Sequence, residues 1–160
     1  MTQPWPVAEL DGISRLHVLA AMTPGAVVVE TILSQRLDQV WSVAADLERE
    51  LPRYLRDVRR FTITRREGDR LEADARGYLG LRAHFDVLLR PGWCVMRSRF
   101  LLGAMAAEPT VDGTRFAFLG GFRVPGLRTV APVIRLVGRP AVAHVVSRYG
   151  ARVAAQYETG

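Results

Sequence analysis

Between residues 58 and 123 the chain repeats one pattern, in which short stretches of alternating hydrophobic and polar positions are separated by turns. The turns are rich in glycine, proline and aspartate, which favour tight chain reversals. Because connections this short join neighbouring strands, we expect an antiparallel meander. The expected strands span residues 58–66, 70–76, 81–89, 94–101, 103–111 and 114–123.

Other patterns flank this meander on both sides. The β-branched segment 26–34 predicts a first strand, and hydrophobic residues at helical spacing predict a helix over 36–47 and a second helical turn around Pro52. After the meander, residues 130–137 show helical spacing that a glycine interrupts, and Pro140 suits the first turn of a last helix. One face of that helix carries Val142, Val145, Val146, Tyr149, Val153 and Tyr157, and the opposite stripe carries His144, Arg148 and Arg152.

The first 25 residues form an extension to this pattern. Hydrophobic residues recur at helical spacing from Leu10 to Ala20 and predict a short helix, while a strand over 14–20 fits nearly as well. The 160 residues are enough for one sizeable core. We therefore divide the chain into an N-terminal extension, residues 1–25, and one domain, residues 26–158.

Side chains alternate between the two faces of a strand, so the hydrophobic positions constrain how the strands pair. In the second and third strands of the meander the odd-numbered positions are apolar. Pairing Ala75 with Leu81 buries these positions together and brings opposite charges face to face on the other side. The outer pairs in this register are Asp74 with Arg82 and Glu72 with His84.

The remaining hairpins are paired by the same reasoning. Leu89 opposite Cys94 again matches opposite charges on the outer face, and Asp112-Gly113 is a strong signal for a two-residue turn. The expected pairs include Phe85 with Ser98, Ala83 with Phe100, Asp86 with Arg97, His84 with Arg99, Ala107 with Phe118 and Met105 with Gly120. The inward positions then form a concave face of Ala73, Ala75, Ala83, Phe85, Val87, Cys94, Met96, Ser98, Phe100, Met105, Phe116 and Phe118.

Several residues of this concave face are small, and the last helix offers mostly valines to cover it. Two arrangements fit this pattern: an apolar pocket beneath the helix, or an ordinary core that larger side chains fill. We favour the pocket, which predicts a small hydrophobic molecule as the partner.

Charge and composition narrow the choice of partner. The net charge is +6, and every basic side chain other than histidine is arginine. An arginine-rich surface suits nucleic acid, membrane headgroups or an acidic ligand, whereas general replacement of lysine by arginine needs no anionic partner. Acidic residues interleave with most of the arginines, and the densest basic stretch, 49–70, lacks the aromatic interleaving of a single-strand binding surface. We therefore expect no nucleic acid partner and keep peripheral membrane contact as a possibility.

Cysteine and histidine usage argues against a metal centre. The single cysteine, Cys94, excludes an intramolecular disulfide and a cysteine cluster, and His17, His84 and His144 lie far apart in sequence. We expect no metal and no cofactor. The hydrophobic runs are too short to span a bilayer or to form a signal peptide, so we expect a cytoplasmic protein. We expect it to be a monomer or a homodimer.

Two stretches carry a resemblance to a known family. The first is VVVETILSQRLDQVWSVAADLERELPRYLRDV, which contains a Val40-Trp41 pair, Asp46 and the Leu-Pro-x-Tyr-Leu turn at 51–55. The second is RPAVAHVVSRYGARVAA near the C-terminus. Both resemble the START-like, or SRPBCC, superfamily. The similarity is greatest to its polyketide cyclase/dehydrase-like branch, which also resembles coenzyme Q-binding proteins. The resemblance implies an α+β helix-grip fold, in which a curved seven-stranded antiparallel sheet surrounds a long C-terminal helix, with two short helices after the first strand. Members of this superfamily bind lipids, sterols, quinones, hormones or polyketides in the cavity, and some are enzymes.

The inward positions and the expected helical gate supply the candidate site. The leading hypothesis is a carrier or sensor of a lipid, quinone or polyketide. The alternative is a polyketide cyclase or dehydratase in which the Ser98 and Tyr54 hydroxyls donate hydrogen bonds to a ligand carbonyl. Cys94 lacks a histidine on its face and His84 is expected to be exposed, so no catalytic residue is assigned. Asp46, Glu48 and Glu50 are expected on the surface. The candidate ligand-binding residues are Trp41, Tyr54, Phe85, Val87, Met96, Ser98, Phe100, Met105, Phe116 and Phe118.

Overall fold

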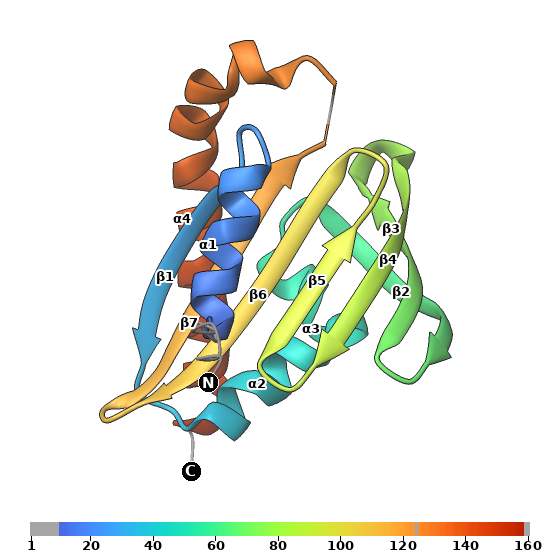
Figure 1. The fold of residues 1–160 in the computed structure, drawn as a ribbon. Coiled ribbons are helices and arrows are strands. Elements are labelled where there is room, and N and C mark those ends of the chain that lie inside the picture. Colours follow the sequence, from blue (N-terminus) through green and yellow to red (C-terminus); the bar gives the residue numbers. More distant parts are fainter. Residues whose placement is uncertain (1–9, 124, 159–160) are drawn as a thin grey trace, which may run out of the picture.

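The computed structural model describes residues 10–123 and 125–158, which form one curved sheet with helices on both faces (Figure 1). The seven strands are all antiparallel and follow the order β1-β7-β6-β5-β4-β3-β2. The strands are β1 (Val27–Leu33), β2 (Val58–Glu67), β3 (Arg70–Gly77), β4 (Arg82–Arg90), β5 (Trp93–Arg97), β6 (Leu101–Thr110) and β7 (Gly113–Phe122). The helices are α1 (Gly12–Met22), α2 (Leu37–Ala45), α3 (Leu47–Tyr54) and α4 (Ala131–Tyr157), with short 3₁₀ turns η1 (Tyr78–Gly80) and η2 (Leu127–Thr129).

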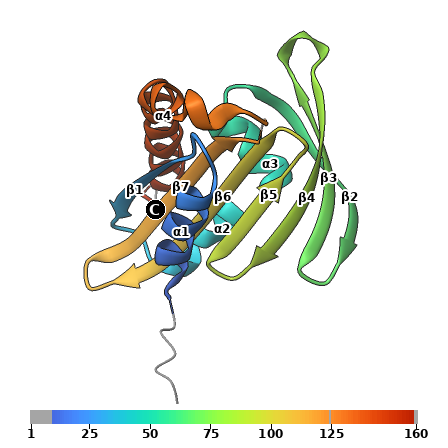
Figure 2. The same ribbon diagram turned by 45° about the horizontal axis from the view of Figure 1, so that its top comes forward.

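The main core lies between the concave face of the sheet and α2, α3 and α4 (Figure 2). Phe116 and Met105 point from the sheet into this core, and Val146, Tyr149 and Val153 meet them from α4. The α+β helix-grip architecture expected from the sequence is therefore confirmed, including the seven strands and the two short helices after β1.

The N-terminal segment adds a second, smaller core on the convex face. Helix α1 buries Ile13 and Leu16 against small residues of the central strands, and the Asp11 carboxylate caps it by accepting the Ser14 N–H at 2.6 Å. Of the two sequence interpretations of this segment, the helix is the one observed, and it lies on the side of the sheet away from α4. The other buried residues of this core are Ala26, just before β1, and Leu102, Ala104, Ala106, Ala117 and Leu119 of β6 and β7.

The last helix differs from the expectation of a break near Gly138 and a new start at Pro140. Helix α4 runs without interruption from Ala131 to Tyr157 and contains Pro140. A proline within a helix removes one backbone hydrogen bond. The buried side chains Val142, Val146 and Tyr149 hold the following turns against the sheet, and this packing outweighs the local preference for an end.

The register expected for β4 and β5 is confirmed, whereas two other hairpins are shifted. Leu89 lies opposite Cys94, and Asp86 lies opposite Arg97 at 3.7 Å. Ala75 pairs with Ala83 instead of Leu81, because η1 and its flanking residues form a longer connection than expected. This register puts Asp74 opposite His84, Arg76 opposite Arg82 and Glu72 opposite Asp86.

The β6–β7 turn is formed by Val111 and Asp112 instead of Asp112-Gly113, so Met105 pairs with Phe118. Gly113 is needed inside the ladder, since a Cβ there would lie 2.0 Å from the Leu33 carbonyl oxygen. The shift by two residues also puts Ala107 opposite Phe116 and keeps the inward and outward faces unchanged.

The fifth strand ends earlier than expected. Strand β5 stops at Arg97, and Ser98 to Phe100 form the connection to β6, so the expected pairs of Ser98 with Phe85, Phe100 with Ala83, and Arg99 with His84 do not form. The Ser98 hydroxyl accepts the N–H groups of Phe100 and Leu101 at 3.3 and 3.0 Å, which favours a turn at this point.

Candidate functional site

A cavity of about 550 Å³ lies between α4 and the concave face, at the end of the sheet where β7 finishes and β6 begins. Most of its wall is hydrophobic and comes from the sheet, the end of α3 and the first half of α4. The side chains that make up this hydrophobic wall include Val27, Leu51, Leu55, Val58, Phe61, Ala75, Phe85, Met96, Phe118, Ile134, Val142 and Val145.

Two glycines on adjacent strands help to make the space. Gly103 of β6 pairs with Gly120 of β7, and their outer neighbours in the same row are Met96 of β5 and Val27 of β1. All four residues line the cavity. A Cβ on Gly120 would lie 3.1 Å from Val142 Cγ2, so the missing side chains also let α4 approach the sheet. The alternating pattern predicts small inward residues but not this glycine pair.

Helix α4 contributes one of its faces to the cavity wall. Ile134, Gly138, Ala141, Val142 and Val145 all line the cavity and recur at helical spacing. The sequence shows helical spacing on both sides of Gly138, but the break expected there divided this face between two segments.

Ionisable side chains line the cavity only around its mouth. Among the lining residues, they are those of Arg56, Asp57 and His144, and all three are exposed to solvent. Arg56 and Asp57 follow α3, whereas His144 lies on α4. The interior therefore offers shape and hydrophobic contact, and charge is confined to the entrance. Sequence reasoning missed this group, because the positions are far apart in the chain and His144 was assigned to a solvent stripe.

The sequence-predicted ligand-binding residues fall into two groups. Phe85, Met96 and Phe118 line the cavity. The others lie elsewhere: Val87, Met105 and Phe116 are buried in the packed part of the core, Trp41 is half-buried against it, Tyr54 is buried, and Ser98 and Phe100 belong to the β5–β6 connection.

Aromatic side chains fill part of the core between α4 and the sheet. Tyr149 stacks on Phe116 with ring centroids 4.1 Å apart, and the Tyr54 ring meets Tyr149 edge-on at 5.2 Å. The Tyr149 hydroxyl donates to the Val40 carbonyl and the Tyr54 hydroxyl to Met105 Sδ. Burial raises the pKa of both phenols, so neither is suited to proton transfer near neutral pH.

One predicted surface carboxylate is buried beside this aromatic group. Glu50 is only 2% exposed and bonds to Arg152 of α4, while Arg148 donates to the Arg53 carbonyl at 2.7 Å. The expected solvent-facing positions of Glu50, Arg148 and Arg152 are thus corrected, because these side chains join α4 to α3. The arginine lowers the Glu50 pKa mainly through its side-chain hydrogen bonds.

Cys94 and His84, two further side chains with reactive groups, lie outside the cavity lining. Cys94 is fully buried, and burial raises the pKa of its thiol to about 12. The exposed His84 ring bonds to Asp74 at 2.9 Å instead of the expected Glu72, and this bond raises its pKa. Within residues 10–123 and 125–158, no three His, Cys, Asp or Glu side chains are arranged to hold a metal ion.

Comparisons with known proteins agree with the fold. A Thermus thermophilus protein of solved structure shares 19% identity and a TM-score of 0.62, with 82% of this chain and 99% of that chain covered. A START superfamily protein from Mycobacterium smegmatis shares 15% identity and a TM-score of 0.58, covering 82% and 98%. The ZhuI aromatase/cyclase from Streptomyces sp. R1128 shares 12% identity and a TM-score of 0.62, covering 84% and 98%.

No protein-family model matches the chain, and a search of curated proteins gives no significant match. The structural likenesses nevertheless show that the chain has a START-like fold that is also found in polyketide aromatase/cyclases. In the described part of the chain, no helix combines the length and hydrophobicity required to span a bilayer.

Proposed function

We propose that this chain binds a small hydrophobic molecule, such as a lipid, quinone or polyketide, in the cavity beneath α4 and acts as its carrier or sensor. The observation that carries the proposal is the hydrophobic, open cavity of about 550 Å³ in a START-like fold. Its volume is within the range of roughly 300–1,000 Å³ that is typical of small-molecule pockets.

The distribution of polar groups favours carrying over catalysis. The deep wall around Phe85, Met96 and Phe118 offers no ionisable side chain, and Cys94 and Tyr54 are buried outside the cavity lining. A ligand in this wall is therefore held by burial of its hydrophobic surface, while Arg56, Asp57 and His144 meet a polar end at the mouth.

A matched pair of substitutions on α4 tests this proposal. Ala141 lines the cavity and Ala143 does not, although both are exposed alanines of the same helix. The fluorescent hydrophobic probe N-phenyl-1-naphthylamine should bind the wild-type protein, and Ala141→Trp should weaken this binding by about tenfold or more because the indole occupies the entrance. Ala143→Trp should change the affinity less than about twofold. Absence of probe binding, together with no retained hydrophobic molecule in native mass spectrometry, would refute the proposal.

A second candidate is a cyclase or dehydratase, because the ionisable side chains at the mouth could exchange protons with a polyketone bound in the cavity. His144 and Asp57 supply the candidate acid and base, and the fold is shared with an aromatase/cyclase. An aryl-capped poly-β-ketone thioester incubated with the protein should lose one molecule of water, as seen by mass spectrometry. This loss of water should depend on His144. It should persist in the His84→Gln variant, because His84 lies outside the cavity lining and is hydrogen-bonded to Asp74. If wild-type protein leaves the substrate unchanged, the catalytic alternative is excluded for this substrate class.

A further inference from the structure

The β3–β4 turn lies at the same end of the molecule as the cavity (Figures 1 and 2), and it carries exposed hydrophobic side chains. Leu79 is 100% exposed, and Tyr78 and Leu81 are also largely exposed. Leu79 has a φ of 64°, a left-handed conformation that a leucine rarely adopts. Burial within this chain does not explain a leucine here, and glycine would adopt this backbone with less strain.

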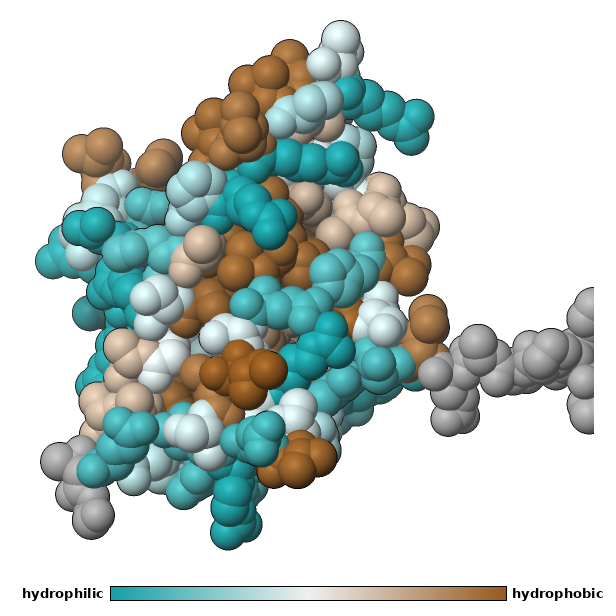
Figure 3. Space-filling model, turned by 90° about the vertical axis from the view of Figure 1, so that its left-hand side faces the viewer, coloured by the Kyte–Doolittle hydropathy of each residue, from teal (hydrophilic) through white to brown (hydrophobic). Residues whose placement is uncertain are grey.

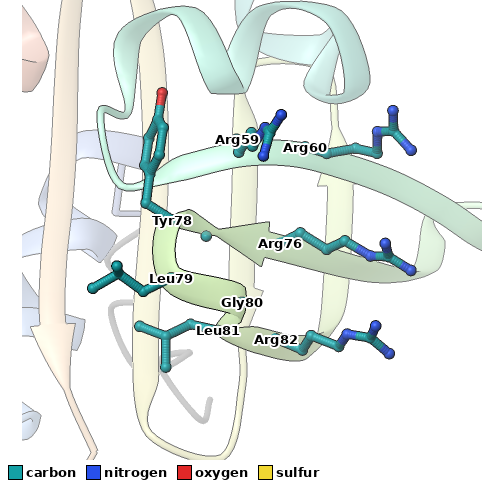
Figure 4. A pocket seen from close by; sticks show the side chains of 9 residues that line it. Arg59, Arg60, Arg76, Tyr78, Leu79, Gly80, Leu81 and Arg82 are labelled. Atoms are coloured by element: carbon teal, nitrogen blue, oxygen red, sulfur yellow. The ribbon is translucent and has the colours of Figure 1, made fainter.

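Three arginines, Arg60, Arg76 and Arg82, lie side by side on adjacent strands next to this turn, and we call them the arginine row. Arg60 of β2 pairs with Arg76 of β3, and Arg76 pairs with Arg82 of β4. Figure 4 shows the three side chains extending to the same side, whereas Tyr78, Leu79 and Leu81 point away from them. Together with Arg59 and the turn, the row borders a surface hollow of about 440 Å³.

The charge of the arginine row is uncompensated among the residues that the structure describes. No carboxylate there forms an ion pair with Arg59, Arg60, Arg76 or Arg82, whereas Arg90 and Arg97 of the same sheet each form one and Arg65 forms two. Like charges directly opposite each other across strands are destabilising. An anion in the hollow would relieve this repulsion, since guanidinium groups bind phosphate through paired hydrogen bonds.

A second exposed hydrophobic surface lies across the mouth, on the first turns of α4. Leu136 is 77% exposed, and Val133 and Val137 beside it are also exposed. Arg135 and Arg139 lie on the same turns of the helix, so exposed hydrophobic and basic side chains are close together here. Figure 3 shows hydrophobic side chains gathered over this end of the molecule next to hydrophilic ones.

We propose that the end of the molecule around the cavity mouth docks onto the surface of a bilayer containing anionic lipids. A flat partner can reach the β3–β4 turn and the start of α4 together, because both project at the end where the cavity opens. The exposed leucines and valines enter the interface, and the arginine row meets headgroup phosphates. This inference goes beyond the proposed function and does not depend on it, since docking requires no ligand in the cavity.

Sedimentation with vesicles of phosphatidylcholine alone, or with roughly one third phosphatidylglycerol, tests this inference. Wild-type protein should bind the anionic vesicles and largely ignore the neutral ones, and added salt should weaken binding. The triple variant Arg60→Gln, Arg76→Gln, Arg82→Gln should bind at least about tenfold more weakly. The triple variant Arg65→Gln, Arg66→Gln, Arg70→Gln, at the opposite end of the same hairpin, loses equal charge and should lose less than about threefold.

The hydrophobic part has its own matched pair. Leu79→Ser should weaken vesicle binding by about threefold or more, whereas Val111→Ser, at an exposed turn on the opposite end of the sheet, should leave it unchanged. Circular dichroism confirms that these surface variants remain folded. Equal losses in both arginine triples, or no binding to anionic vesicles at low salt, would overturn the proposal. Wild-type protein that binds inositol hexaphosphate or an acidic protein but no vesicles would overturn it as well. Probe binding without vesicles tests the cavity separately.

Discussion

The carboxylate of Glu50 accepts two hydrogen bonds from the guanidinium of Arg152, from Nε at 2.6 Å and from Nη2 at 3.0 Å. Glu50 lies on α3 and Arg152 on α4, so this bidentate pair fixes the last helix to the short helix beside it. Arg53 adds a bond to Glu50 at 3.3 Å. The pair is a partly buried ionic connection, with Glu50 buried and Arg152 partly exposed, between the two helical elements that border the cavity.

Removing the arginine should therefore destabilise the fold. Arg152→Met keeps much of the aliphatic side chain but leaves a buried carboxylate without its main partner, and the free energy of unfolding should fall by about 2 to 3 kcal/mol. Arg36→Met is the matched control, because Arg36 forms an exposed pair with Asp38 and should cost less than about 0.5 kcal/mol. Urea unfolding measures both values. Equal losses in the two variants would contradict the structural role of the pair.

The same pair predicts how stability depends on pH. The hydrogen bonds from Arg152 lower the Glu50 pKa below its ordinary value of 4.5, so the folded state favours the charged form. The resulting stabilisation is fully present above the unfolded pKa and is lost as the pH falls through the folded pKa. Urea unfolding from about pH 3 to about pH 7 should show a stability difference between wild type and Glu50→Gln that shrinks below pH 4.5. A difference that is constant over this range would contradict the prediction.

The sequence was sufficient to predict the fold but not every register. Alternation assigns each residue to a face, and a shift by two preserves that assignment, so the inward face survives although Ala75 pairs with Ala83 instead of Leu81. Charge pairing favoured the register that does not form, because the observed one keeps a basic partner for Asp74 but sets Arg76 opposite Arg82 and Glu72 opposite Asp86. The connection decides the register, and it depends on Leu79 adopting a left-handed backbone that its residue type does not favour.

The cavity was only partly predictable for a different physical reason. Alternation reports side chains, and a glycine contributes none, so the space above Gly103 and Gly120 left no signal in the hydrophobic pattern. The burial of Glu50, in contrast, did leave a signal in the sequence pattern. Leu47, Glu50, Leu51 and Tyr54 recur at helical spacing and are all buried, so the helical phase placed Glu50 on the inner face despite its charged neighbours.

The buried thiol of Cys94 should be protected from alkylation. The thiolate is the reactive form, and burial both raises the pKa of this thiol to about 12 and blocks access to it. Iodoacetamide at about pH 8 should therefore modify the native protein very slowly and the urea-unfolded protein rapidly. Mass spectrometry at timed intervals measures the two rates. Native protein that reacts as quickly as unfolded protein would show that this part of the core opens readily.

The position of Ser98 predicts a structural effect that can be separated from ligand binding. Its hydroxyl accepts the backbone N–H groups of Phe100 and Leu101 at the β5–β6 turn, and it does not line the cavity. Ser98→Ala should therefore lower the free energy of unfolding by about 1 kcal/mol, because two turn donors lose their acceptor. The affinity for N-phenyl-1-naphthylamine should stay within about twofold of wild type, whereas Met96→Ala, which alters the cavity wall, should change it. Loss of probe affinity in Ser98→Ala without loss of stability would instead support the ligand-bonding role that the sequence suggested for Ser98.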